Sequence, residues 1–83
     1  MNAEHLVVMA NQISQFFESQ PNRAMAVDGV LTHIRKFWDP RMRTSIIAHL
    51  HAGGEGMREM TRDAIVKLEA EQVAKAAAKV AAG

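Results

Sequence analysis

The dipeptide Asp39-Pro40 constrains the fold most, because it ends one helix and begins another. Aspartate is a preferred N-cap, and proline suits the first helical position, where its missing N–H would have no intrahelical partner. The sequence therefore predicts a helix that ends near Trp38 and another that begins at Pro40. This corner holds the only tryptophan and, in the order of the chain, the basic residues Arg35, Lys36, Arg41 and Arg43.

Two amphipathic helices are expected before this corner, because apolar residues recur there with a 3.6-residue period. The first is capped by Asn2, and the second runs from Arg23 to about Trp38 behind the cap Asn22. The expected core-facing residues are Leu6, Met9, Ala10, Ile13, Phe16 and Phe17 in the first helix and Val27, Val30, Leu31, Ile34, Phe37 and Trp38 in the second. The matched spacing and short connection predict an antiparallel helical hairpin.

Two further helices are predicted after the corner. The third spans Pro40 to about His51, and Arg43 falls within its apolar arc, where we expect it to pair with Asp39. Extension to solvent or contact with another protein are the alternatives for that guanidinium. Glycine-rich residues 52–56 end this helix, and a fourth begins near Met57. Its expected inner residues are Met57, Met60, Ala64, Ile65 and Leu68, and its expected i,i+4 ion pairs are Asp63–Lys67 and Glu71–Lys75.

These patterns predict an all-α fold, a small bundle of about four helices. It comprises an N-terminal helical hairpin, a third helix after Asp39-Pro40, and a long C-terminal helix with a frayed alanine-rich end. Residues 1–72 are expected to form a single helical domain, and residues 73–83 an alanine/lysine-rich tail that is helical or disordered. Gly29 lies off the apolar face of the second helix, where it would permit the close approach of a neighbour.

The composition removes several kinds of chemistry. The chain has no cysteine, so it has no disulfide, thiol nucleophile, zinc-thiolate site or cysteine-ligated iron–sulfur cluster. His49 and His51 are two residues apart, which is not the i,i+4 spacing of helical metal ligands. The glycine-rich turn lacks the Lys-Ser/Thr of a phosphate-binding loop. We expect no catalytic, cofactor-binding or metal site, and a chain that is not an enzyme by itself.

A protein-contact role is the expected function of the corner. Arginine and aromatic residues dominate the energetics of protein interfaces, so the candidate partner-binding residues are Arg35, Trp38, Arg41 and Arg43, together with the off-face Val8. A helix-turn-helix-like nucleic-acid-binding module is an alternative, with Arg41 and Arg43 near the start of a recognition helix. The net charge of only +1 argues against it. With neither a secretory signal nor a long apolar run, we expect a cytoplasmic protein without a membrane partner.

Two segments resemble a known family. Residues 5–17 (HLVVMANQISQFF) and residues 33–42 (HIRKFWDPRM), with the Gly-Gly turn that follows, are similar to the delta subunit of soluble NAD-dependent formate dehydrogenases, over roughly residues 1–70. The resemblance implies an accessory subunit of a molybdenum enzyme complex that oxidises formate and reduces NAD. It implies binding to the catalytic (alpha) subunit, which it would stabilise or help to assemble, and through it to the other subunits.

The same resemblance implies where the cofactors lie. The bis-MGD molybdenum cofactor, the iron–sulfur clusters and FMN are expected in the larger partner subunits and none in this chain. A transient assembly or cofactor-insertion chaperone for the same enzyme is the alternative role.

Overall fold

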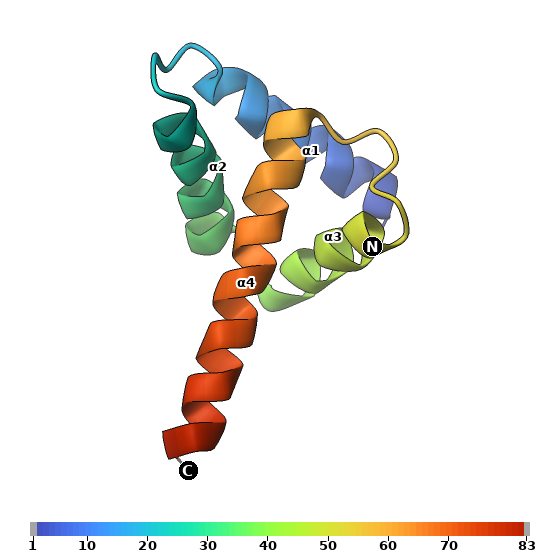
Figure 1. The fold of residues 1–83 in the computed structure, drawn as a ribbon. Helices are drawn as coiled ribbons and strands as arrows, with labels where there is room; N and C mark the ends of the chain where they lie inside the picture. Colours follow the sequence, from blue (N-terminus) through green and yellow to red (C-terminus); the bar gives the residue numbers. More distant parts are fainter. Residues whose placement is uncertain (1, 83) are drawn as a thin grey trace.

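A computed structural model describes the backbone of residues 2–82 and the side chains of residues 2–80. It confirms the all-α prediction with four helices: α1 (Ala3–Phe17), α2 (Arg23–Phe37), α3 (Pro40–His51) and α4 (Glu59–Ala82) (Figure 1). Within the described range, none of these helices is both long enough and apolar enough to cross a membrane.

Local side-chain caps set the starts of the first three helices, as the sequence predicts. Each cap residue has an extended backbone, and its side-chain oxygen accepts a hydrogen bond from an amide in the first turn. The caps and their donors are Asn2 with the Glu4 amide (2.8 Å), Asn22 with the Met25 amide (3.2 Å) and Asp39 with the Met42 amide (3.0 Å).

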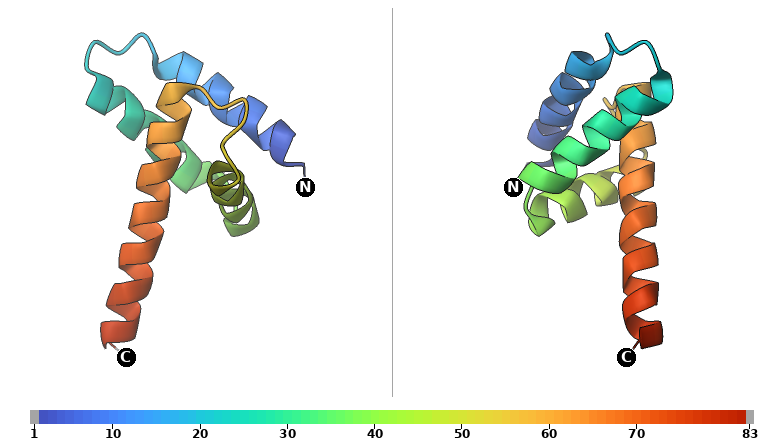
Figure 2. Two further views of the ribbon diagram at one scale, coloured as in Figure 1. Left: turned by 45° about the vertical axis from the view of Figure 1, so that its right-hand side comes forward. Right: turned by 90° about the vertical axis from the view of Figure 1, so that its left-hand side faces the viewer.

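The first two helices form the predicted hairpin, and α4 contacts all three other helices. α1 and α2 run in opposite directions, and α3 turns away from the end of α2 to pack beside α1 and α4 (Figure 2). The buried apolar residues come from all four helices and form one cluster, made of Leu6, Val7, Ala10, Ala26, Val27, Val30, Leu31, Ile34, Trp38, Ile46, Met60, Ala64, Ile65 and Leu68.

Two of the expected core residues are in fact exposed. Phe16 is 76% exposed and Phe37 is 71% exposed, whereas Phe17 is half-buried and Trp38 is buried. Phe16 points away from the side of α1 that Leu6, Ala10 and Ser14 bury, whereas Phe37 is the last residue of α2 and lies beyond its last buried residue, Ile34. The buried face of α1 is therefore rotated relative to the predicted one, and it includes Val7, which was not predicted in the core.

A buried polar network joins α1 to the start of α4. The hydroxyls of Ser14 and Thr61 lie 2.7 Å apart, and both residues are fully buried. The Thr61 hydroxyl also donates to Asn11 Oδ1 at 2.8 Å, and the same oxygen accepts the Arg58 amide at 3.0 Å. Asn11 Nδ2 donates to the Gly56 carbonyl at 2.8 Å. Asn11 therefore caps the fourth helix from another helix, a role that no local pattern could reveal.

Asp63, Lys67 and Glu71 of α4 pair with α2 and not within α4, so the expected pairs Asp63–Lys67 and Glu71–Lys75 are wrong. The three pairs between the two helices are Arg23–Asp63 (2.8 Å), Lys67–Asp28 (3.4 Å) and Arg35–Glu71 (3.1 Å). All six side chains are partly exposed, so each pair contributes only about 0–1 kcal/mol. Together they help to fix the position of α4 along α2.

The C-terminal half of α4 extends away from the other helices (Figure 1). The helix has 24 residues and is therefore about 36 Å long. It continues to Ala82, and a helical tail is one of the two states expected for residues 73–83. Among the side chains that the structure describes, up to residue 80, the last buried one is Leu68, and every side chain from residue 73 to residue 80 is exposed. We call residues 73–82 the projecting segment.

Candidate protein-binding site

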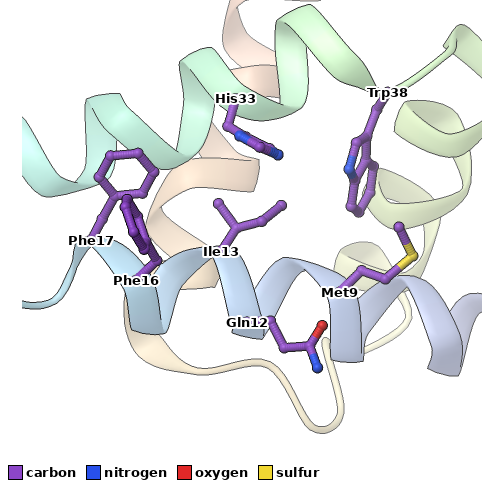
Figure 3. A pocket seen from close by; sticks show the side chains of 7 residues that line it. All are labelled: Met9, Gln12, Ile13, Phe16, Phe17, His33 and Trp38. Atoms are coloured by element: carbon purple, nitrogen blue, oxygen red, sulfur yellow. The ribbon is translucent and has the colours of Figure 1, made fainter.

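An apolar groove opens between α1 and the C-terminal half of α2. It has a volume of about 560 Å³ and is lined by Met9, Gln12, Ile13, Phe16, Phe17, His33 and Trp38 (Figure 3). Met9 and Trp38 approach each other at one end, the two phenylalanines stand at the other, and Ile13 points from α1 towards α2 between them. Most of the lining is therefore aliphatic or aromatic, as in sites that bind apolar groups.

One glycine allows the two helices to approach at the phenylalanine end. A Cβ atom at Gly29 would lie 2.6 Å from both Cδ1 and Cε1 of Phe17, so the ring packs directly on the α2 backbone. This confirms the close approach that the sequence predicts at Gly29. Phe17 in turn meets Phe16 edge to face, with ring centroids 5.1 Å apart.

Two exposed phenylalanines flank the groove. Phe16 lines it directly, and the Phe37 ring lies tilted against that of the groove residue His33, with ring centroids 4.8 Å apart. Both are more than two-thirds exposed. Isolated exposed apolar residues are common, but two large aromatic side chains beside one apolar hollow are typical of a surface that binds another protein.

Trp38 and Arg43 occupy the corner as structural residues. Trp38 is only 5% exposed and contributes one wall of the groove. The Arg43 guanidinium donates a hydrogen bond to the Trp38 carbonyl. The expected ion pair of Arg43 with Asp39 is therefore wrong, because the Asp39 carboxylate accepts the Met42 amide and the arginine satisfies the end of α2.

The remaining predicted residues do not gather on one surface. Arg35 turns towards α4, where its guanidinium makes a two-point contact with Glu71. Arg41 lies exposed on the outer side of α3, and among the side chains of residues 2–80 it has no ion pair. Val8 is 52% exposed and borders a separate hollow between α1 and the glycine-rich turn.

The glycine-rich turn is occupied with its own hydrogen bonds. The amides of Gly53 and Gly54 donate to the carbonyls of Leu50 and His49, at 3.1 and 2.9 Å, so they cap the end of α3. Arg62 donates to the carbonyls of both glycines, at 2.8 and 3.1 Å. The amides of Gly53 and Gly54 are therefore not free to bind a phosphate.

The histidines of α3 point to different partners. His49 meets the Glu55 carbonyl, and His51 pairs with Glu69 of α4. In the part of the chain that the structure describes, no three metal-binding side chains are close enough to hold an ion. The groove is therefore the best candidate for a binding site in the described part of the chain.

Comparison with known proteins gives one match. The model of the family described as the NADH-dependent formate dehydrogenase delta subunit, FdsD, matches residues 5–65. The matched range covers α1 except its first two residues, all of α2 and α3, and the first residues of α4, and it therefore includes the whole groove. No curated protein and no solved structure gives a significant match.

Proposed function

Because the chain belongs to the family of NADH-dependent formate dehydrogenase delta subunits, we propose that it is a non-catalytic accessory subunit of such an enzyme. It binds the molybdenum-containing catalytic subunit and stabilises it or helps it to assemble. The observation that carries this proposal is the aromatic groove, with Phe16 and Phe37 exposed beside it. In this proposal the bis-MGD molybdenum cofactor, the iron–sulfur clusters and FMN belong to the partner subunits.

The groove offers enough apolar surface to drive binding. Complete burial of a phenylalanine side chain is worth about 1.5–3 kcal/mol, so the two exposed rings together offer about 3–6 kcal/mol, less what each already buries. Binding energy at protein interfaces is concentrated in a few such aromatic side chains. Folding of this chain alone does not gain that energy, whereas a partner that covers the rings does.

The predicted basic residues have different places in this proposal. Arg41 is exposed and lacks an ion pair among residues 2–80, so it is suited to a charged contact at the edge of the interface. Trp38 and Arg43 support the groove from within, and Arg35 holds α4. Val8 would extend the interface only if the partner also covers the far side of α1.

The test is co-expression of the tagged chain with the catalytic subunit from the same genome. The wild-type chain should co-elute with that subunit in fixed stoichiometry on size exclusion. The variant Phe16→Gln/Phe37→Gln should bind about 100-fold more weakly or worse, which corresponds to about 3 kcal/mol. Circular dichroism should show that it keeps its helical content, because neither ring is part of the core.

The matched control is Met25→Gln. Met25 is also on α2 and is 62% exposed, but it lies outside the groove. Its substitution should leave the affinity unchanged. If Phe16→Gln/Phe37→Gln binds as tightly as the control, the groove is not the docking site. If the chain binds the immature catalytic subunit but is missing from the finished complex, its role is that of a transient chaperone.

A further inference from the structure

The projecting segment has no packing partner within its own chain. All described side chains from residue 73 to residue 80 are exposed, yet the segment is helical throughout. In proteins most helical stability comes from tertiary packing, and helices shorter than about 12–15 residues are marginal in water without it. The segment also lies beyond residues 5–65, to which the family resemblance applies.

One side of α4 carries a line of exposed valines. Val66, Val73 and Val80 are seven residues apart and are 54%, 63% and 80% exposed. Ala70 and Ala77 lie between them, which gives the alternating 4,3 spacing of a coiled-coil seam. The line is about 21 Å long at 1.5 Å per residue. It begins at Val66, two residues before the buried Leu68, and continues along the projecting segment to Val80.

The opposite side of the projecting segment is basic. Lys75 and Lys79 follow the buried Leu68 at seven and eleven residues, so they lie within about 20° of its direction on the helix. The face of α4 that packs against the core thus becomes a lysine face once the helix leaves the body. Neither lysine has an ion pair among the described side chains, and the nearby Glu71 already pairs with Arg35.

We infer that the projecting segment inserts into a cleft of another subunit of the formate dehydrogenase, between an apolar wall that covers the valine line and an acidic wall that faces the lysines. This rests on the proposed function, and it adds a second contact that is separate from the groove. Such a cleft suits a helix with an apolar side and a basic side. The valines are then buried against apolar side chains, and the lysines face carboxylates.

A second copy of this chain does not supply such a cleft. Its apolar groove has only Gln12 and His33 as polar lining residues. The carboxylates near that groove are all engaged: Glu18 with Arg58, Asp28 with Lys67 and Asp39 with the Met42 amide. At its groove, a copy therefore offers an apolar wall without an acidic one, and the charge of the lysine face points to a different, acidic protein.

The experiment measures binding of the full chain to the formate dehydrogenase complex purified without it. Val73→Gln/Val80→Gln should weaken binding at least tenfold, whereas Val73→Ile/Val80→Ile should stay within about threefold of wild type. Lys75→Glu/Lys79→Glu should also weaken binding at least tenfold, whereas Lys75→Arg/Lys79→Arg, which keeps the charge, should bind like the wild-type chain. All four variants should keep wild-type thermal stability, because these side chains are exposed.

The outcomes separate this inference from the proposed function. If the tail variants bind like wild type while Phe16→Gln/Phe37→Gln does not, the inserted segment is wrong and the groove remains. If only the valine variant or only the lysine variant binds normally, the two-walled cleft is wrong. If the wild-type chain does not bind the complex, both proposals fail. A wild-type dimer that Val73→Gln/Val80→Gln abolishes in sedimentation would identify a second copy as the occupant and overturn the inference.

Discussion

The contact between Gly29 and Phe17 yields a quantitative prediction for Gly29→Ala. Alanine is favoured over glycine inside a helix by up to about 1 kcal/mol, so the substitution alone should be stabilising. The new Cβ, however, would lie 2.6 Å from two atoms of the Phe17 ring. Overpacking of this kind typically costs about 1–3 kcal/mol. The net expectation is a loss of about 0–2 kcal/mol in the free energy of unfolding.

A double-mutant cycle separates the two effects. In the background Phe17→Ala the clash is absent, so Gly29→Ala should now stabilise the chain by about 1 kcal/mol. The difference between the two backgrounds is therefore about 1–3 kcal/mol and is measured by urea denaturation followed by circular dichroism. A gain of about 1 kcal/mol from Gly29→Ala in both backgrounds would refute the reasoning, because the ring could not then be packed on the glycine.

Three further predictions concern stability. Thr61→Val removes the hydroxyl that joins Ser14 to Asn11 in the buried network and should lower the free energy of unfolding by about 1–3 kcal/mol in the same urea assay; no measurable loss would mean that the network is dispensable. Gly54→Ala should lower the free energy of unfolding by at least about 1–2 kcal/mol, because Gly54 has φ +65° and a Cβ there would lie 2.9 Å from Arg62 Nη1. A melting temperature equal to that of the wild-type chain would contradict the geometry of the turn. Deletion of residues 73–83 should change the free energy of unfolding by less than about 1 kcal/mol, since none of the described side chains there is buried; a larger loss would show that the segment packs on the body.

The helix boundaries could be predicted because the signals are local. Asn2, Asn22 and Asp39 each form a hydrogen bond within three residues of the chain, and Pro40 acts through its own ring. These interactions need no distant partner. The apolar positions of α2 were also correct up to Ile34, because one wide apolar face leaves little choice of orientation.

The candidate site could be predicted only in part. The sequence directed attention to the corner at Trp38, which does form one end of the groove. It placed Phe16 and Phe37 in the core, whereas the buried side of α1 is that of Leu6, Ala10 and Ser14, and α2 ends at Phe37, beyond its last buried residue. It also spread the site over Arg35 and Val8, which the fold turns to other surfaces.

The sequence by itself determined the all-α class, the limits of the first three helices, the absence of cysteine chemistry and the resemblance to the formate dehydrogenase delta subunits. The tertiary structure decided which side of each helix is covered, because that depends on the positions of the neighbouring helices. It paired Asp63 and Glu71 with α2 and not with α4, and it gave Arg43 a carbonyl in place of Asp39. The apolar groove, likewise, exists only once α1, α2 and Trp38 are brought together.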